Sequence, residues 1–234
     1  MAHSPDMPPQ KGKADTGLRG RKKARRRQDI LRVAGTLFNE KGFDATTMAD
    51  IAEAAEISPP TVFNYFGSKD NILSALLFEG AARERVQHLA KPRSSGRPFA
   101  EIIGELLCEI TENTMRIAGK RVWRYAESAN IRRTNLEFQR QFIDTDLELM
   151  RLIRTYLRDY DLTLRTGGEP DHTFLARLFF DRWTARYFEF IKEDAMTLEE
   201  HFNDLRSDSR ALVDLLFADS FALASPLRSA RQAR

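Results

Sequence analysis

The chain has 234 residues, of which 42% are hydrophobic and 30% are charged, a balance typical of a folded globular protein. No apolar run approaches the roughly 20 residues that cross a bilayer, and the polar, proline-rich residues 1–10 do not resemble a signal peptide. The single cysteine, Cys108, excludes an internal disulfide. We therefore expect a cytoplasmic protein with no membrane partner, in which Cys108 is an inert, buried thiol, with a redox-sensing thiol as the alternative.

The net charge of +3 is unevenly distributed along the chain. Residues 1–30 hold nine lysines and arginines against three aspartates, and most of this excess lies between residues 19 and 27. A dense basic cluster on a glycine-containing tail is typical of an arm that binds a polyanion. We expect a flexible basic arm over residues 1–24, with a tail that only aids solubility as the alternative.

The hydrophobic pattern is helical nearly throughout. Apolar residues recur with helical spacing from Ile30 to Phe38, and Gly42 stands just past the end of this first helix, where glycine is favoured. The next predicted helices cover about 47–55, 59–66 and 68–90. Residues 91–98, rich in proline, serine, glycine and basic side chains, are the clearest interruption in the chain.

Further helices are expected after this interruption. An apolar stripe begins at Phe99, and residues 166–170 form a second break. The helices predicted after the stripe cover about 121–130, 135–160, 171–193 and 198–222. The domains that we predict are a helix-turn-helix unit over 25–72, a connecting helix over 73–90, a C-terminal domain over 91–225 and a loose tail over 226–234.

The segment from Thr46 to Lys69 carries most of the functional signal. Thr47 and Asp50 form a capping box, in which the hydroxyl accepts from the Asp50 amide and the carboxylate accepts from the Thr47 amide. Ser58 stands before two prolines, and its hydroxyl is placed to cap the amide of Thr61. Two capped helices of barely two turns, separated by three or four residues, favour a helix-turn-helix over a generic hairpin.

The second short helix is predicted to present a polar face. Val62 and Phe66 should point inward and leave Asn64 exposed, in a face that holds Thr and Tyr but no acid. Such a face suits a major groove, because Asn can pair with adenine through two hydrogen bonds and Pro or Thr methyl groups can contact thymine. Lys69 begins the next helix, whose positive end is a natural phosphate site. An ordinary solvent-exposed surface is the alternative. The predicted DNA-binding residues are Arg25, Arg26, Thr46, Thr47, Ser58, Pro59, Pro60, Thr61, Asn64, Tyr65 and Lys69.

Residues 37–73, LFNEKGFDATTMADIAEAAEISPPTVFNYFGSKDNIL, resemble the DNA-binding domain of the TetR family of bacterial regulators. The resemblance rests on Gly-aromatic after the first helix, Thr-Thr, Ile-Ala…Ala, Ser-x-x-Thr and aromatic-x-aromatic-Phe-x-Ser-Lys. It implies DNA contacts at Thr47, Pro59, Pro60, Thr61, Asn64, Tyr65 and Lys69. It also implies a helical C-terminal domain that dimerises and holds a small-molecule pocket.

Two positions depart from the family pattern. Glu56 stands in the turn where the family usually has glycine, at a cost of about 1 kcal/mol if that residue is left-handed. Phe63 stands where the family often has tyrosine, so a phosphate-binding hydroxyl is expected to be missing. Neither departure changes the expected fold.

The residues themselves also favour dimerisation. Between residues 174 and 191 apolar side chains occur almost all round the predicted helix, and such a helix must be buried on all sides. In a small domain this implies a partner subunit, and the next helix is the natural second half of a four-helix interface. We expect a homodimer whose interface contains Phe174, Leu178, Phe179, Phe188, Leu205, Leu212 and Leu216.

Aromatic residues of the C-terminal half are candidates for the lining of an apolar cavity, with threonine or glutamate orienting a ligand. For any single aromatic residue at helical spacing, an ordinary core position remains the alternative. The predicted ligand-binding residues are Thr111, Thr114, Met115, Trp123, Glu127, Phe138, Phe142 and Trp183.

The sequence offers no signal for an enzyme. The four histidines are scattered without metal-ligand spacing, and there is neither a glycine-rich phosphate loop nor a G-x-S-x-G motif, so we expect no catalysis, metal or cofactor. We predict an all-α protein with an N-terminal three-helix helix-turn-helix domain and a C-terminal helical domain for ligand binding and dimerisation. The expected function is a repressor released from a palindromic double-stranded DNA operator by a small, mostly apolar effector. An activator and a constitutive DNA-binding protein without a ligand are the alternatives.

Overall fold

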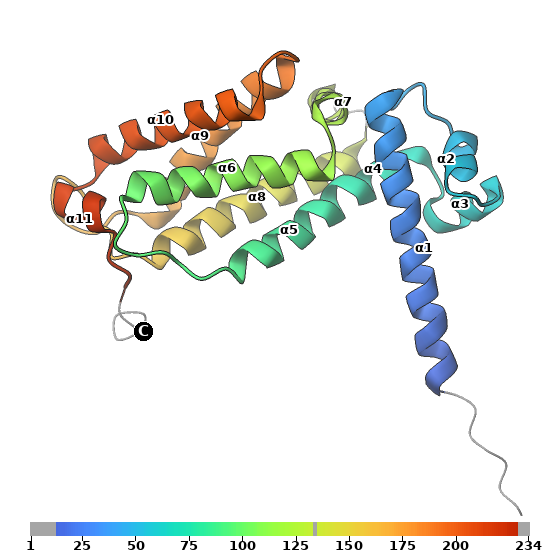
Figure 1. Ribbon diagram of the computed structural model, residues 1–234, viewed down its shortest axis with the longest axis horizontal. Coiled ribbons are helices and arrows are strands. Elements are labelled where there is room, and N and C mark those ends of the chain that lie inside the picture. The colour runs from blue at the N-terminus through green and yellow to red at the C-terminus, as the bar shows by residue number, and fades with distance from the viewer. Residues whose placement is uncertain (1–12, 133–134, 229–234) are drawn as a thin grey trace, which may run out of the picture.

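The structure, a computed structural model, describes residues 13–132 and 135–228 (Figure 1). In this part of the chain the regular elements are helices, as predicted, and the only β-type pairings are isolated bridges. No helix among these residues is both long enough and apolar enough to span a membrane. The helices are α1 (Lys13–Glu40), α2 (Met48–Ala54), α3 (Pro59–Phe66), α4 (Lys69–Ser74), the π-helical turn η1 (Ala75–Glu79), α5 (Gly80–Leu89), α6 (Phe99–Ile117), α7 (Lys120–Arg132), α8 (Leu136–Arg158), α9 (His172–Lys192), α10 (Leu198–Leu216) and α11 (Asp219–Ala224).

The first helix is much longer than predicted. Residues 13–24, which we predicted to be a flexible arm, belong to α1, whereas residues 1–12 lie outside the described part of the chain. Lysine, arginine and alanine, which occupy residues 21–27, are good helix formers, so nothing in that segment ends the helix. The helix therefore extends away from the rest of the molecule (Figure 1).

Side-chain caps set the start of several other helices. The Thr47 hydroxyl accepts from the Asp50 amide at 3.0 Å, and the Asp50 carboxylate accepts from the Thr47 amide at 2.7 Å, which confirms the predicted capping box. Asn135 and Asp171 cap α8 and α9 through their side-chain oxygens, and Thr197 forms a second capping box at α10. Each cap satisfies amide groups that a helix leaves unpaired at its start.

The predicted connecting helix is continuous but not uniform. It consists of α4, η1 and α5, with the π-helical turn at Ala75–Glu79 in its middle. Gly80 follows this turn, and a Cβ atom there would lie 2.9 Å from Cγ2 of Ile117 on α6. The absence of a side chain at Gly80 therefore allows α5 and α6 to approach closely.

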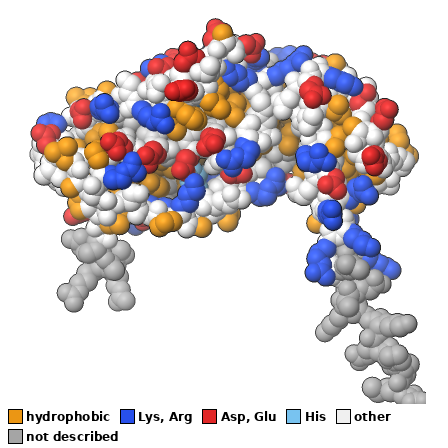
Figure 2. Space-filling view, viewed as in Figure 1, with side chains coloured by type: hydrophobic (Ala, Val, Ile, Leu, Met, Phe, Trp, Pro, Cys, Tyr) orange, Lys and Arg blue, Asp and Glu red, His pale blue; other side chains and the backbone are white. Residues whose placement is uncertain are grey.

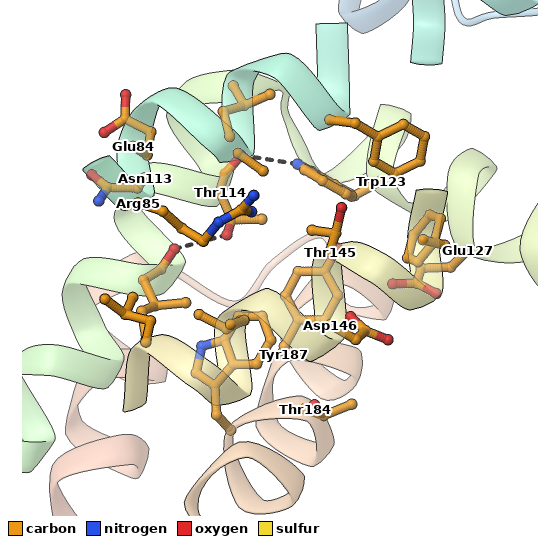
Figure 3. Close-up of a pocket in the computed structure, with 18 of the residues that line it drawn as sticks. Glu84, Arg85, Asn113, Thr114, Trp123, Glu127, Thr145, Asp146, Thr184 and Tyr187 are labelled. Atoms are coloured by element: carbon orange, nitrogen blue, oxygen red, sulfur yellow. Dashed lines mark hydrogen bonds between the residues drawn. The ribbon is translucent and has the colours of Figure 1, made fainter. Parts of the chain in front are cut away.

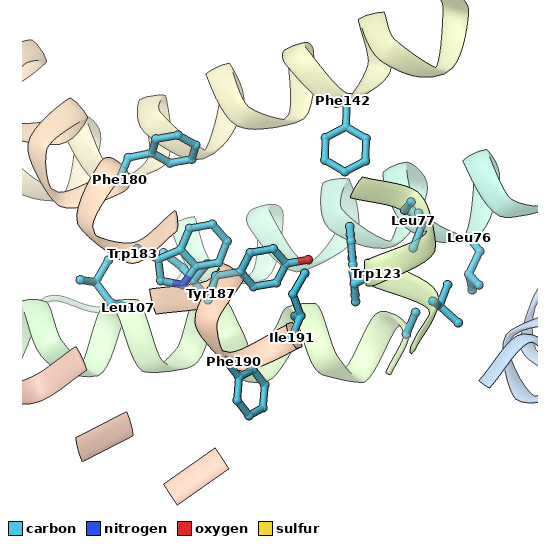
Figure 4. Packing of buried hydrophobic residues seen from close by; sticks show 14 of the residues in the cluster. Leu76, Leu77, Leu107, Trp123, Phe142, Phe180, Trp183, Tyr187, Phe190 and Ile191 are labelled. Carbon is cyan, nitrogen blue, oxygen red and sulfur yellow. The ribbon is translucent and has the colours of Figure 1, made fainter. Parts of the chain in front are cut away.

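The C-terminal helices form a bundle in which α6 packs along α10 and α8 packs along α9. Helix α7 crosses the end of this bundle and also contacts α1 (Figure 1). Aromatic rings pack together inside the bundle. The Trp183 and Tyr187 rings are stacked with centroids 5.1 Å apart, and Tyr187 meets Trp123 edge to face at 6.3 Å (Figure 4). The core thus joins α7 to α9 through side chains that are all nearly buried.

Two predictions for the C-terminal end are wrong. The helix predicted over 198–222 ends at Leu216, because the buried Phe217 is extended and pairs with Leu164 in an isolated bridge. The tail is not loose between 226 and 228, where the Asp161 amide donates to the Pro226 carbonyl and the Arg228 amide donates to the Asp159 carbonyl, both at 2.9 Å. Residues 229–234 lie outside the described part.

Candidate nucleic-acid interface and internal cavity

Helices α2 and α3 form a compact helix-turn-helix held by a few apolar side chains. Ile51 and Val62 are fully buried, and Phe66 is nearly so, which matches the predicted inward face of α3. Glu56 in the turn has φ of 53°, so this side chain occupies the left-handed region expected from its position. A left-handed backbone at a residue other than glycine costs about 1 kcal/mol.

The outward face of α3 is polar and accessible. Pro59, Pro60 and Asn64 are exposed, while Thr61 and Tyr65 are partly exposed. Figure 1 shows α3 at the end of the molecule farthest from the C-terminal bundle. The face therefore has the residue types and the access that reading a DNA groove requires.

Ser58 precedes α3 as predicted, but its cap differs. Its hydroxyl lies 2.8 Å from the Thr61 hydroxyl and makes no bond to a backbone amide, whereas the Thr61 amide donates to the Ser58 carbonyl at 2.9 Å. Because prolines at 59 and 60 have no amide hydrogens, the helix start has little need of a side-chain cap. Both hydroxyls stay at the surface, where they remain accessible to a partner.

Thr46 and Lys69, both predicted DNA contacts, have structural roles. Thr46 is fully buried, and its hydroxyl donates to the Gly42 carbonyl at 2.8 Å, so its side chain cannot reach DNA. The Lys69 ammonium donates to the carbonyls of Phe43 and Thr46, each at 2.7 Å, and to that of Asp44 at 3.3 Å. It also lies over the Phe43 ring, 4.4 Å from the centroid. Lys69 thus ties the loop before α2 to the start of α4.

Basic residues of α1 border α3. Arg25 and Arg26 are exposed, and Figure 2 shows basic side chains gathered on the part of α1 that extends from the body. Arg27 is different, because its guanidinium pairs with both oxygens of Glu79 at 2.5 and 2.6 Å and lies over the Phe66 ring. The groove between α1 and α3 is lined by Arg19, Lys22, Lys23, Arg25, Arg26, Asp29, Ile57, Thr61 and Tyr65.

The contacts of Lys69 predict a loss of stability when they are removed. Lys69→Met should lower the free energy of unfolding by about 1–3 kcal/mol, because the variant leaves three loop carbonyls without their charged donor. Urea unfolding in the absence of DNA measures this. Lys23→Met, at an exposed position on α1, is the control and should stay within about 0.5 kcal/mol. Equal stability of the two variants would contradict the structural role of Lys69.

A cavity of about 240 Å³ lies inside the C-terminal bundle (Figure 3). Helices α5 to α9 all contribute to its walls, which combine apolar and aromatic side chains with a few polar groups. It is lined by Phe78, Ala81, Glu84, Arg85, His88, Ile110, Asn113, Thr114, Ile117, Trp123, Glu127, Asn130, Ile131, Phe142, Thr145, Asp146, Leu149, Leu152, Trp183, Thr184, Tyr187 and Phe188. Apolar walls with a few polar groups are typical of small-molecule sites.

The structure brings together five of the eight predicted ligand-binding residues around this cavity: Thr114, Trp123, Glu127, Phe142 and Trp183. The other three do not line it.

Thr111 is fully buried beside the cavity, where its hydroxyl accepts from Nε1 of Trp183 at 2.9 Å and lies 3.0 Å from Nε2 of His201. Phe138 supports the wall from behind, with its ring against those of Phe78 and Phe142. Met115 packs against the core. The helical periodicity predicts that Thr111, Phe138 and Met115 face inward. It does not distinguish a residue that packs in the core from one that lines a cavity.

Sequence reasoning missed most polar residues of the lining, among them Arg85, Asp146 and Tyr187. Arg85 and Asp146 lie on amphipathic helices, where a charged residue is normally assigned to solvent. Tyr187 lies within the apolar run of residues 174–191, whose pattern predicts burial against a partner subunit rather than a cavity. No local signal in the sequence distinguishes them, because their common environment arises only when α5, α8 and α9 pack together.

Two carboxyl groups of the cavity, those of Glu127 and Asp146, have strongly raised pKa values. Burial, together with the nearby Asp146 carboxylate, raises the pKa of Glu127 to about 8, against an opposing hydrogen bond with Asn130. Burial raises the pKa of Asp146 to about 6, and Arg177 opposes the shift. Tyr187 also has its pKa raised, by burial and by the two carboxyl groups. At neutral pH Glu127 is therefore mostly protonated.

These shifts predict a pH-dependent stability. Between pH 4.5 and about 8 the unfolded chain has lost the Glu127 proton that the folded chain keeps, so the free energy of unfolding falls as pH rises. Glu127→Gln removes this effect, and its stability relative to the wild type should increase by about 1–3 kcal/mol from pH 5 to pH 9. Denaturant unfolding across that range measures it. Asp144→Asn, at an exposed acid on α8, should show no such trend, and a parallel trend in both variants would contradict the assignment.

Helix α7 has two functional faces. Trp123 and Glu127, four residues apart, line the cavity. Arg121 and Tyr125, also four apart, face the DNA-binding end: the Arg121 guanidinium donates to the Glu40 carbonyl at 2.8 Å, and the Tyr125 ring stacks on Phe43 with centroids 4.4 Å apart. Residues four apart share a helix face, so α7 links the cavity directly to the loop before α2.

The predicted interface residues do not all lie on the surface. Phe179 and Leu205 are fully buried within the chain, so they cannot form a dimer contact, and Phe188 lines the cavity. Helix α9 is buried on most sides by its own chain, which weakens the sequence argument for a partner. Phe174 is 66% exposed, and Leu178, Leu212 and Leu216 are partly exposed. Leu215, which we did not predict, is 70% exposed on α10.

Comparisons with known proteins agree with this arrangement. Residues 30–76 match the family described as bacterial regulatory proteins, tetR family. The chain is 30% identical over 163 residues to the transcriptional repressor AcnR of Corynebacterium glutamicum, a match that covers 67% of this chain and 79% of that protein. It is 34% identical over 82 residues to the repressor BdcR of Escherichia coli, covering 35% of this chain and 41% of BdcR.

Among solved structures, the chain resembles that of the TetR-family repressor FadR of Thermus thermophilus in complex with lauroyl-CoA. The TM-score is 0.54 at 24% identity, and the match covers 82% of this chain and 95% of that one. This likeness supports the fold. The matches to several curated relatives, BdcR included, span less than half of the relatives' own length.

Proposed function

This chain belongs to the TetR family of bacterial transcriptional regulators, and we propose that it is a homodimeric repressor that a small molecule releases from a DNA operator. The observation that carries the proposal is the polar, acid-free face of α3 beside the basic end of α1. The curated relatives AcnR and BdcR are named as repressors, which favours repression over activation. An activator would use the same DNA contacts.

The outward face of α3 and the basic side chains of α1 are proposed to bind different parts of the DNA. Exposed Asn64, with the prolines and Thr61, suits base reading in the major groove. The arginines and lysines of α1 suit phosphates, because they provide charge without sequence preference. A dimer would present two α3 helices, so we propose a roughly palindromic operator with half-sites one helical turn apart, about 34–36 Å, or adapted to it by bending.

Asn64→Ala should weaken binding to the specific operator by about 1–3 kcal/mol and relax the preference at one base pair in each half-site. Binding to scrambled DNA should change little, because the phosphate contacts remain. Titrations of both duplexes at one fixed salt concentration measure this, and Asn203→Ala, at an exposed position on α10, is the control. Equal losses on specific and scrambled DNA would show that Asn64 only positions the helix.

Dimerisation is proposed through the outer faces of α9 and α10. Phe174 and Leu178 share one face of α9, and Leu215 extends the exposed apolar surface on α10. Exposed large apolar side chains that gather on neighbouring helices often mark a protein interface. The proposal keeps four of the residues predicted from sequence, Phe174, Leu178, Leu212 and Leu216, and adds Leu215.

Phe174→Glu combined with Leu215→Glu should shift the dimer to monomers and weaken operator binding at least about tenfold, because each subunit would then hold only one half-site. Sedimentation velocity at several protein concentrations measures the dimer fraction. Val86→Glu, at a 69% exposed position on α5, places the same charge away from the proposed interface and should leave the dimer intact. An unchanged dimer in the double variant would place the interface elsewhere.

We propose that ligand binding in the cavity lowers DNA affinity through a movement of α7. A ligand that contacts Trp123 and Glu127 acts on the same helix whose other face holds Glu40 and Phe43. A ligand shifts an equilibrium only through different affinities for the two states, and about 1–3 kcal/mol of coupling gives a 5–150-fold loss of DNA affinity. The connecting helix from α4 to α5 provides a second mechanical path, since Ala81 and Arg85 also line the cavity.

A further inference from the structure

The charges around the cavity are segregated. On α5, Arg85 is influenced by Glu148, Glu84 pairs with Arg116 at 3.3 Å, and Nδ1 of His88 lies 3.3 Å from Glu109. Glu84 thus has a cationic partner at this end, Arg85 is opposed only by the more distant Glu148, and burial lowers the pKa of His88. The α7–α8 end holds the two carboxyl groups of Glu127 and Asp146 (Figure 3).

The carboxyl pair lacks a counter-ion of its own. No cation in the described part of the chain is among the groups that act on Glu127, whose charged neighbour is Asp146. Asp146 is influenced by Arg177, but that guanidinium already donates to both oxygens of Asp181, at 2.7 and 2.9 Å. At neutral pH, with Asp146 ionised and Glu127 protonated, the pair holds about one negative charge, which a bound cation would neutralise while favouring ionisation of Glu127.

A second observation points to a ligand at the same place. Tyr187 is 3% exposed, and its buried hydroxyl has no hydrogen-bond partner among the described residues. Figure 4 shows this hydroxyl directed toward the Trp123 ring, which lines the cavity. A buried polar group without a partner costs about 1–3 kcal/mol, so it marks a position where a bound molecule would improve the contacts.

We propose that the cavity binds an organic cation, with its positive head between Glu127 and Asp146 and its apolar body against Trp123, Phe142 and Tyr187. Aromatic faces attract cations as well as apolar groups, so the head and the body of such a molecule both find suitable walls. The proposal names the ligand class of the proposed repressor and in that sense rests on the proposed function.

An anionic ligand is the competing possibility, because Arg85 also lines the cavity. Its charge is already balanced in part by Glu148, and an anion in the cavity would meet the Glu127–Asp146 pair. The cation, in contrast, meets unbalanced charge of the opposite sign. The observations therefore favour a cation.

Cation binding should release a proton. Glu127 keeps its proton up to about pH 8 in the free protein, and a cation stabilises the ionised form. The groups that face it are Asp146 and Asn130, with Tyr187 and Arg177 beyond. Below pH 8 each bound cation should displace one proton from Glu127, so affinity should rise with pH.

The chain provides its own reporter, because its two tryptophans, Trp123 and Trp183, both line the cavity. Phenyltrimethylammonium is a suitable probe, since its charge does not titrate, and tert-butylbenzene is its uncharged carbon isostere. Tryptophan fluorescence of the full chain should show that the cation binds at least about 10-fold tighter than the isostere at pH 9. The cation should bind about 10-fold or more tightly at pH 9 than at pH 6, with no such change for the isostere.

Glu127→Gln and Asp146→Asn should each weaken cation binding about 10-fold or more and leave binding of tert-butylbenzene unchanged, which also shows that the cavity is still folded. Glu127→Gln should remove most of the pH dependence. Asp144→Asn, at an exposed acid of the same helix, is the matched control and should bind as the wild type does. Equal affinities for the two probes, or tighter binding of laurate than of the cation, would overturn the proposal.

Operator binding is measured separately, with and without the probe, so that the two proposals fail in different ways. Failure of the cation to bind a protein that still binds operator DNA would overturn the ligand class and leave the repressor intact. A cation that binds without weakening the DNA complex would support the ligand class and overturn ligand-controlled release. Absence of operator binding in every condition would contradict the proposed function itself.

Discussion

The ammonium group of Lys69 holds the loop through which the DNA-binding end contacts α7. It closes the loop of residues 43–46 by binding three carbonyls and lies over Phe43, whose ring stacks in turn on Tyr125 of α7. The start of α2 follows directly from this loop, so the position of the helix-turn-helix depends on the same few contacts. One partly exposed cation therefore helps to fix the start of α2.

The cavity contains polar groups whose burial destabilises the folded protein. Its two carboxyl groups and the Tyr187 hydroxyl are held where solvent cannot fully reach them, a cost that packing elsewhere in the bundle must offset. Stacked rings of Trp183 and Tyr187 and the buried face of α6 supply that packing.

Short-range signals predicted the helix-turn-helix well. The capping box at Thr47, the inward Val62 and Phe66 and the left-handed Glu56 all depend on neighbours within a few residues. Prediction failed where contacts between residues distant in sequence determine the environment of a side chain. Thr46 is buried, and the Lys69 ammonium binds carbonyl groups of the loop before α2. The sequence also could not show whether the apolar helix α9 is buried by its own chain or by a partner subunit. Nor could it show that carboxyl groups of α7 and α8 lie side by side.

The packing of α6 against α10 has a consequence for the order in which the molecule forms. These helices make extensive contacts although about a hundred residues separate them, whereas the helix-turn-helix closes within residues 30–76. Local contacts form quickly, and distant ones wait for the chain that supplies them. During synthesis α3 can thus be in place before α9 has left the ribosome, and the cavity is enclosed only when α9 supplies its wall.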